Sequence, residues 1–599
     1  MLVSKRTLQR VTCCLLKDYY RHIEVSPEHN ANIFFWLLNS QNVKSSNKLI
    51  IWLNGGPGCS SMDGMFLENG PYRVNPDLSV NISSGGWQDH ANIVFVDQPV
   101  GTGFSFADTD SYVKNMTEVG TSFTKFLDLF FEIFPDRAAN ELYVAGESFA
   151  GTYIPYIAHQ MLRENEEAGK TKYDLKGLVI GNGWISPRHQ YEASFDFAVS
   201  RKLLSGSYKN IASQHLDMCR KAIASEELIS IYICEQLLTD AIDSSTHIVN
   251  RKDNQMLCVN QYDIRMKDEP SPDCGMTWPH ELTQVQKYLQ DKEVVKAIHA
   301  SKQMLGWTEC SGGVHRALSG DKSVASFYLM PEILEKVPIL LFSGEYDLIC
   351  NSLGTEYLIG NLTWGGSIGF EHNEKFEWHI GDNLAGYYTE ERNLTYVLVK
   401  DASHMVPYDK PTEMLDMINR FIGVNDGTVN GLHSWIGEKE VTGTPAADPE
   451  PKPTTGAGDA SDNEGTSEEV EDPWSEYYNW GTSLLVVVIL FACVAGFCWY
   501  RSSRAGNARL RGRPDFISKL IGKTGLGGRG KGLKLGQDRS DVNELDELVV
   551  ETPTLFAAED YSDDDDSNHG RYGRSSREGT RDHLLPNRSN FSIDDDEDD

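Results

Sequence analysis

The sequence is short of basic residues. Lysine and arginine together number 55 against 87 aspartates and glutamates, so the formal net charge is −32 in 599 residues. Proteins that bind nucleic acid present a basic surface to the phosphates. This balance of charge argues against nucleic acid as a partner.

Patterns that bind metals or nucleotides are also missing. None of the 11 cysteines has the close CxxC or His/Cys spacing of a zinc site. The stretch "LIGKTG" at 520–525 contains a GKT triplet, but it lacks the upstream glycine of a phosphate-binding loop. No internal repeat is apparent. We therefore expect neither a metal nor another cofactor.

Acidic residues concentrate in segments that have few apolar side chains. These segments are residues 446–473, 561–570 and 594–599. Burial cannot offset the entropy that such segments would lose on ordering, so we expect them to be disordered. Between them lies "GTSLLVVVILFACVAGFCWY" (481–500), which carries no charge and is long enough to span a bilayer as a helix.

The flanks of this apolar segment predict its orientation. Aromatic residues lie at both ends, and the preceding flank is acidic. The segment is followed by five arginines: Arg501, Arg504, Arg509, Arg511 and Arg513. The positive-inside rule then predicts a single-pass type I protein with an acidic lumenal stalk (425–480), a transmembrane helix (481–500) and a cytosolic acidic tail (501–599).

The N-terminus lacks the signal peptide that a lumenal domain requires. Residues 1–21 offer only the short apolar stretch "VTCCLL" before charged residues follow. Either the segment 481–500 is the only insertion signal, or the natural chain begins further upstream. We favour a truncated start.

Cysteines and sequons fit an oxidising, secretory compartment. Six of the seven cysteines in the body of the predicted lumenal domain can pair, and six cysteines allow fifteen pairings. The seven are Cys59, Cys219, Cys234, Cys258, Cys274, Cys310 and Cys350. Four sequons predict glycosylation at Asn81, Asn115, Asn361 and Asn393.

Short apolar runs alternate with helical patterns, as in a parallel sheet covered on both faces. We expect strands at 48–53, 92–97, 141–146, 175–183, 338–344 and 394–399, and helices at 117–135 and 152–167. The segment 184–330 breaks this rhythm and holds five of the seven body cysteines. The prediction is an α/β fold with a hydrolase core at 22–183 and 331–424, interrupted by a disulfide-stapled helical cap domain at 184–330.

A serine lies between a predicted strand and a predicted helix in "GESFAG" (146–151). Serines beside glycines are common in turns, but Ser148 occupies the position of a nucleophile elbow. The usual pattern is G-x-S-x-G, whereas here Ala150 precedes Gly151. Asp347 and His404 each follow a later predicted strand, and the order Ser, Asp, His is that of α/β-hydrolases. We predict these three residues as a catalytic triad.

Glycines after another strand, in "WLNGGPGCSS", can bring backbone N–H groups to a developing oxyanion. We assign Gly56 and Phe149 as the oxyanion donors. The motifs "WLNGGPGCSS", "GESFAGTYIP" and "HMVPYDKP" resemble the serine carboxypeptidases over about 22–422. The acidic stretch, membrane segment and acidic tail are similar to the fungal prohormone-processing members of that family, which trim C-terminal lysine and arginine in the late Golgi.

The resemblance implies further roles. Asn54, Gly55, Glu68 and Glu147 would bind the free carboxylate of the substrate, and Asp63 would favour a basic C-terminal residue. Two neighbouring glutamates cannot both ionise cheaply, so one can remain protonated and donate a hydrogen bond. The implied disulfides are Cys59–Cys310, Cys219–Cys234 and Cys258–Cys274, with Cys350 a free thiol at the substrate pocket.

Two other classes of function remain open from the sequence. A serine esterase or lipase would use the same triad but would not need Glu68 and Glu147. A non-catalytic binding protein on a hydrolase fold would typically lose a triad residue. The favoured interpretation is a carboxypeptidase of the trans-Golgi network membrane that acts on peptides with basic C-termini. Its cytosolic tail would contact the sorting machinery.

Overall fold

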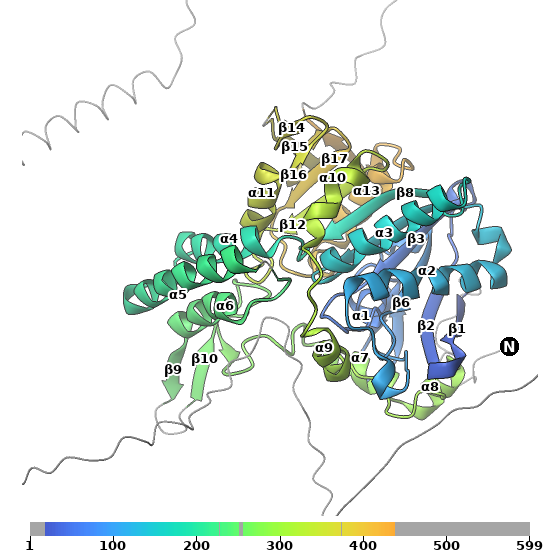
Figure 1. The fold of residues 1–599 in the computed structure, drawn as a ribbon, viewed down its shortest axis with the longest axis horizontal. Coiled ribbons are helices and arrows are strands. Elements are labelled where there is room, and N and C mark those ends of the chain that lie inside the picture. Colours follow the sequence, from blue (N-terminus) through green and yellow to red (C-terminus); the bar gives the residue numbers. More distant parts are fainter. Residues whose placement is uncertain (1–17, 227, 251–254, 373, 438–599) are drawn as a thin grey trace, which may run out of the picture. The chain divides into compact units, whose positions relative to one another are not determined.

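The computed structural model describes residues 18–437, apart from 227, 251–254 and 373. Its central feature is a twelve-stranded sheet in the order β1-β2-β6-β3-β7-β8-β12-β17-β16-β15-β19-β18 (Figure 1). Six neighbouring strands run parallel. They are β6 (Asn92–Asp97), β3 (Lys48–Leu53), β7 (Glu141–Glu147), β8 (Leu175–Gly181), β12 (Ile339–Gly344) and β17 (Leu394–Val399). All six expected strands are therefore present, and β8 ends two residues early.

These six strands are apolar throughout because both faces of the sheet are covered. In β3, Leu49 and Ile51 pack in one hydrophobic cluster, while Ile50 and Trp52 pack in a second cluster on the opposite face. Successive side chains of a strand point to opposite faces, so one continuous apolar run supplies both cores.

Antiparallel strands that the sequence did not reveal extend the sheet on both sides. They are β1 (Asp18–Ser26), β2 (Ala31–Leu38), β15 (Phe376–Ile380), β16 (Asn383–Glu391), β18 (Thr428–Val429) and β19 (Leu432–Ile436). The sheet thus begins before residue 22 and continues past 424, so β19 lies in the range predicted as a stalk. "LHSWI" is short and partly polar, and its pairing with β15 makes it part of the sheet.

Helices cover each face of the sheet. The cluster containing Leu49 and Ile51 includes residues of α2 (Met116–Ile133), α3 (Ala150–Glu167), α10 (Met330–Leu334) and α11 (Ser352–Asn361). The cluster containing Ile50 and Trp52 includes residues of α1 (Met62–Leu67), α7 (Leu282–Leu289), α8 (Lys292–Ala297), α12 (Val406–Asp409) and α13 (Pro411–Phe421). The helices expected at 117–135 and 152–167 correspond to α2 and α3.

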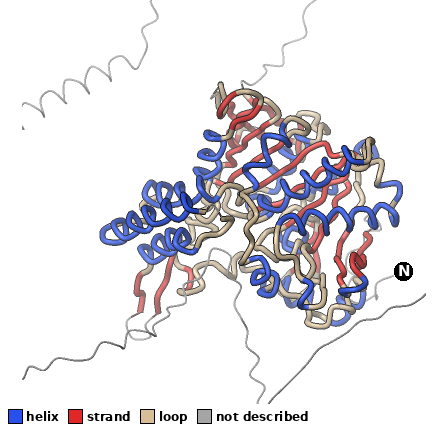
Figure 2. Tube along the Cα trace, in the orientation of Figure 1, coloured by secondary structure: helices blue, strands red, loops and turns tan. Residues whose placement is uncertain are grey.

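The described part of the segment between β8 and β12 adds no strand to the main sheet. Its first part forms α4 (Pro187–Ser200), α5 (Gly206–Ser225) and α6 (Tyr232–Ser245), which lie together beside the sheet, followed by β9 (His247–Asn250), β10 (Gln255–Cys258) and β11 (Glu269–Pro270) (Figures 1 and 2). Its second part includes α7 and α8, which pack in the cluster that contains α1, and α9 (Gly312–Leu318), whose Val314 and Leu318 belong to the other cluster. The segment predicted as one cap therefore consists of two differently packed parts.

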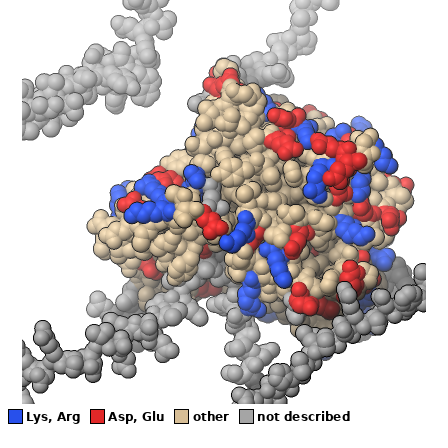
Figure 3. Space-filling view, viewed as in Figure 1, with Lys and Arg blue, Asp and Glu red and all other residues tan. Residues whose placement is uncertain are grey.

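Short elements complete the described chain. They are β4 (Tyr72–Val74), β5 (Val80–Ile82), β13 (Thr363–Trp364), β14 (Ser367–Ile368) and the 3₁₀ helices η1 (Pro27–His29), η2 (Val43–Ser45), η3 (Trp87–Asp89), η4 (Thr109–Ser111), η5 (Pro135–Arg137) and η6 (Ser326–Leu329). On the face drawn in Figure 3, acidic and basic side chains are interspersed. Elsewhere in the described chain, opposite charges also pair between elements: Lys172 contacts both Asp128 of α2 and Glu164 of α3.

Several sequence-based predictions fall outside the described residues. They are the membrane segment 481–500, the cytosolic tail 501–599 and most of the stalk 425–480. Within the part of the chain that the structure does describe, none of the helices combines the length and the apolar character needed to cross a bilayer.

Candidate active site

Ser148 lies in a tight turn between β7 and α3. Its φ of 59° is in the left-handed region, which a non-glycine residue seldom adopts. A Cβ on Gly151 would lie 2.8 Å from Gly183 Cα, so that position requires glycine. Ala150 is fully buried, and its position accommodates a Cβ. The glycine falls one place later than in the usual pattern because the helix approaches the Gly183 backbone there.

Asp347 and His404 meet at the carboxyl ends of β12 and β17. His404 Nδ1 lies 2.8 Å from Asp347 Oδ2, and the second carboxylate oxygen accepts a hydrogen bond from the Ile349 N–H at 3.0 Å. Both side chains are buried. A hydrogen bond from Nδ1 to a carboxylate fixes the imidazole tautomer and leaves Nε2 as the acceptor.

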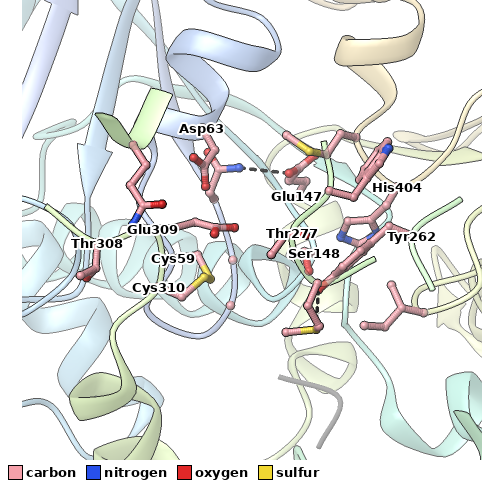
Figure 4. Close-up of a pocket in the computed structure, with 18 of the residues that line it drawn as sticks. Cys59, Asp63, Glu147, Ser148, Tyr262, Thr277, Thr308, Glu309, Cys310 and His404 are labelled. Atoms are coloured by element: carbon pink, nitrogen blue, oxygen red, sulfur yellow. Dashed lines mark hydrogen bonds between the residues drawn. A yellow bond between two sulfur atoms is a disulfide. The ribbon is translucent and has the colours of Figure 1, made fainter. Parts of the chain in front are cut away.

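Ser148 and His404 line one cavity of about 300 Å³, together with Asn54, Gly55, Gly56, Asp63 and Glu147 (Figure 4). The loop after β3 contacts the serine turn directly. A Cβ on Gly55 would lie 2.4 Å from Phe149 N, so only glycine permits this approach. Gly56 follows with a φ of 108°. The predicted oxyanion donors Gly56 and Phe149 therefore belong to two segments in contact.

Asn54 connects the two glutamates predicted to bind a carboxylate. Its amide Nδ2 donates to Glu68 Oε1 at 3.1 Å and to Glu147 Oε1 at 3.0 Å. Its Oδ1 accepts from Trp52 Nε1 and from the Gly64 N–H. With four hydrogen bonds, the amide of Asn54 has one fixed orientation.

Glu68 and Glu147 are both buried, and one oxygen of each, Oε2, has no hydrogen-bond partner among the described residues. Burial, followed by the charge of Glu68, raises the pKa of Glu147 well above its usual value. Burial also raises the pKa of Glu68, while hydrogen bonds from Glu147 and Asn54 oppose that rise. The pair thus favours one shared proton, with Glu147 the more readily protonated partner.

The opposite end of the cavity contains carboxyl groups that sequence reasoning only partly found. Asp63, in the first turn of α1, lies in the cavity with Glu309, which was not predicted (Figure 4). Asp273, also not predicted, lines the same cavity. The Cys59–Cys310 disulfide and the hydrogen bond from the Ser60 N–H to Glu309 O hold Glu309 beside this helix. Glu309 directly precedes Cys310, so the implied disulfide was the signal that could have located it.

Burial is the main cause of the pKa shifts at this end. It raises the pKa of Asp63 well above the usual value, and the charge of Glu309 adds to the effect. The pKa of Glu309 is raised to about 7 by removal from water and by the charge of Asp273. Asp63 Oδ1 has no hydrogen-bond partner in the described chain. A cation placed here would meet carboxyl groups that the protein leaves available.

Aromatic residues that were not predicted form another part of the wall. Tyr262 packs against the His404 ring with centroids 5.2 Å apart, and Trp278 stacks on Tyr262. The main chain of the same tyrosine accepts a hydrogen bond from the His404 N–H at 3.0 Å. Both residues belong to the segment between β8 and β12, whose irregular pattern gave no indication of contact with His404.

The disulfides join the pairs that the resemblance implies: Cys59–Cys310, Cys219–Cys234 and Cys258–Cys274. Cys350 is a free, buried thiol, but its neighbour Ile349, rather than Cys350 itself, is among the cavity-lining residues. Burial raises the pKa of this thiol well above the usual value. Among the four sequon asparagines, Asn81, Asn361 and Asn393 are exposed and Asn115 is partly exposed.

No group of three or more His, Cys, Asp or Glu side chains within the described ranges could hold a metal ion. The paired Asp347 and His404, the serine in its tight turn and the glycine loop have the arrangement of an α/β-hydrolase of the serine type.

Comparison with known proteins narrows this class. A family model described as serine carboxypeptidase matches residues 12–424. The pheromone-processing carboxypeptidase of Verticillium alfalfae is 42% identical over 92% of this chain and 91% of its own length, and that of Colletotrichum graminicola is 40% identical over 93% of each. The crystal structure of a prohormone-processing carboxypeptidase from Saccharomyces cerevisiae has 32% identity and a TM-score of 0.66, covering 72% of this chain and 97% of that one. The chain belongs to the serine carboxypeptidase family.

Proposed function

We propose that this serine carboxypeptidase removes C-terminal lysine and arginine residues from peptide precursors after an endoprotease has cleaved them. The observation that supports this substrate class is the group of carboxyl side chains, Asp63, Glu309 and Asp273, in the cavity that also contains Ser148 and Glu147. Desolvated carboxylates favour lysine and arginine side chains through charge-assisted hydrogen bonds. The fungal relatives are named pheromone-processing carboxypeptidases, which supports peptide precursors as the substrates.

In the proposed mechanism, Ser148 Oγ attacks the carbonyl carbon of the last peptide bond while His404 Nε2 accepts its proton. The N–H groups of Gly56 and Phe149 donate hydrogen bonds to the oxyanion of the tetrahedral intermediate. His404 then gives the proton to the leaving amino group, which departs as the free C-terminal amino acid. A water molecule attacks the acyl-enzyme by the same route and regenerates Ser148.

The free carboxylate of the substrate would be bound by Asn54, Gly55, Glu68 and Glu147. A protonated Glu147 donates a hydrogen bond to that carboxylate, while Glu68 retains the shared negative charge. Binding of the substrate is strongest while the pair holds its proton. Because the pKa of Glu147 is raised, that proton is present in mildly acidic solution and is lost as the pH increases.

Release of the last residue from matched peptides tests this function. Peptides that end in Lys, Arg or Leu are compared, each as a free acid and as a C-terminal amide. We expect the acids ending in Lys and Arg to give the highest kcat/KM and the amides to be poor substrates. Equal rates on peptide acids and amides would favour an esterase-like hydrolase. Equal rates on peptides ending in Lys and in Leu would contradict a role of the acidic end in specificity.

We also propose a location for the enzyme. An apolar segment at 481–500, with arginines after it, supports a single-pass type I protein of the trans-Golgi network membrane whose catalytic domain faces the lumen. The three disulfides and the exposed sequons support a secretory compartment. Protease treatment of sealed Golgi vesicles tests the topology: we expect only the tail after residue 500 to be cleaved. We also expect sorting proteins to bind that tail.

A further inference from the structure

A tetrapeptide without a catalytic group contacts all three segments of the proposed triad. It is "GNGW" (181–184), where β8 ends, and β8 lies between β7 and β12 in the sheet. Gly181 O accepts a hydrogen bond from the Ser148 N–H at 3.0 Å, and the Trp184 N–H donates to Ser148 O at 2.8 Å. The backbone of the tetrapeptide therefore fixes both polar main-chain groups of the nucleophile.

Asn182 makes the other connections through its side chain. Its Nδ2 donates to His404 O at 2.5 Å and to Ser403 O at 3.0 Å, and its Oδ1 accepts from the Gly344 N–H at 2.9 Å. The side chain is fully buried. One amide thus connects the end of β12, three residues before Asp347, with the main chain of His404.

Close packing makes these contacts sensitive to small displacements. A Cβ on Gly344 would lie 2.0 Å from Ser403 O, so the loops that carry Asp347 and His404 approach each other at a position where only glycine fits. Two carbonyl oxygens, of Ser403 and His404, point toward Asn182 Nδ2. Without a donor at that point, two buried acceptors would lose their shared partner.

We propose that Asn182 is a positioning residue, whose amide holds the His404 loop against β12 so that His404 meets both Asp347 and Ser148. This inference rests on the proposed triad. A displacement of about 1 Å can cost roughly 100-fold in rate, because proton transfer needs a short and aligned contact. Asn182 would therefore affect kcat more than KM, since it does not line the cavity.

The variant Asn182→Asp tests this in the full-length enzyme. The new carboxyl group has the shape of the amide and can still accept from the Gly344 N–H. When ionised it donates nothing and repels the two carbonyl oxygens, but when protonated its O–H can donate to one of them. We expect kcat to fall about 100-fold at pH 7.5 with KM within about threefold of wild type.

The ratio of variant to wild-type kcat across the pH range is the decisive measurement, because the ratio cancels the titration of groups that the two enzymes share. We expect this ratio to rise about tenfold or more between pH 7.5 and pH 5, as the aspartate gains its proton. Asn182→Ala introduces no group that titrates, so the ratio of its kcat to the wild-type kcat should remain low across the same pH range.

Asn92 provides a matched control. It begins β6 and lies at the amino ends of the parallel strands, away from the carboxyl ends that carry the proposed triad. Its Nδ2 also donates to two carbonyl oxygens, of Ser46 and Lys48, and its Oδ1 accepts from the Ser40 N–H, and it too is buried. Asn92→Asp should lower the melting temperature as Asn182→Asp does, yet leave kcat, corrected for the folded fraction by near-UV circular dichroism, within twofold of wild type.

A flat pH ratio for Asn182→Asp, or a loss of kcat that its folded fraction explains, would overturn the positioning role. So would an equal, pH-dependent loss in Asn92→Asp. Failure of the triad itself would be recognised separately, because Ser148→Ala would then retain activity. If Asn182→Asp and Asn182→Ala do not fold, Asn182→Ser, which keeps one donor, decides: recovery of kcat supports the role, and inactivity in folded enzyme contradicts it.

Discussion

The catalytic end and the acidic end of the cavity satisfy their polar groups in different ways. At the catalytic end, His404 and Asp347 are buried, and each makes hydrogen bonds to other parts of the protein. At the acidic end, Asp63 Oδ1 has no partner among the described residues. One buried oxygen each of Glu68 and Glu147 is in the same condition.

Buried polar atoms are normally hydrogen-bonded, and leaving one unpaired costs about 1–3 kcal/mol. Unpaired buried atoms also occur outside the cavity, as at Asp321, but Asp63 and Glu147 line the cavity, where a ligand could supply the missing partner. Preformed hydrogen bonds suit the chemical step, which needs fixed geometry. Unpaired carboxyl groups suit recognition, because the proposed basic substrate would bring the charge and the donors that complete them.

Removal of the proposed nucleophile is the strongest test of the proposed catalytic end. Ser148→Ala should lower kcat by at least about 10⁴-fold while a peptide still binds, because the groups that would hold the carboxylate are intact. Stopped assays give kcat, and calorimetry gives the affinity for the peptide. Ser45→Ala, a buried serine in η2, serves as the control and should be fully active. Residual activity of Ser148→Ala within tenfold of wild type contradicts the triad.

Substitution at the junction of the two ends should have the next largest effect. Glu147→Gln should flatten the pH dependence of KM for peptide acids, because an amide donates at every pH, so that a wild-type rise in KM of about tenfold or more between pH 5 and pH 8 is lost. In the wild type, KM should rise as the pH increases through the raised pKa of Glu147.

Glu235→Gln is the matched control for this prediction. Glu235 is a buried glutamate of α6 that lies outside the cavity. Its substitution should leave the pH profile of KM unchanged. A flat profile from pH 5 to 8 in the wild-type enzyme would rule out a functional shared proton.

Neutralisation of the acidic end should change specificity rather than rate. Asp63→Asn and Glu309→Gln should each reduce the preference for C-terminal Lys or Arg over Leu about tenfold, with kcat/KM for the Leu peptide within threefold of wild type. Competition between Lys and Leu peptides in one reaction measures the ratio. Asp321→Asn, which also removes a buried carboxylate with an unpaired oxygen, should leave the ratio unchanged. An equal loss of kcat/KM for the Lys and Leu peptides would indicate that these acids support folding rather than specificity.

The smallest effect is expected at Cys350. The thiolate is the reactive form, and burial raises the pKa of this thiol, so we expect a mercurial to react about tenfold more slowly than with free cysteine at pH 7. Since Ile349 rather than Cys350 lines the cavity, a bound product amino acid should not slow the labelling. Cys350→Ala should keep kcat/KM within twofold. Complete protection by the product would place the thiol in the substrate pocket.

Much of the framework could be predicted because it depends on short-range patterns. The six parallel strands are continuous apolar runs, and Ser148, Asp347 and His404 each follow one of them. Carboxyl ends of parallel strands meet at one edge of a sheet, so their convergence follows from the topology. The antiparallel strands β1, β15 and β19 were missed because their alternation is irregular and their pairing partners are distant in the chain.

The sequence by itself determined the strand–turn–helix units, the residues placed at their junctions and the cysteines available for pairing. The tertiary structure alone brought Glu309 and Asp273 beside Asp63 and Tyr262 against His404. It also set the amide of Asn182 between two loops. The physical reason is that most of these contacts join segments more than a hundred residues apart, through side chains whose direction no local periodicity encodes. Packing of the whole core decides where those side chains lie.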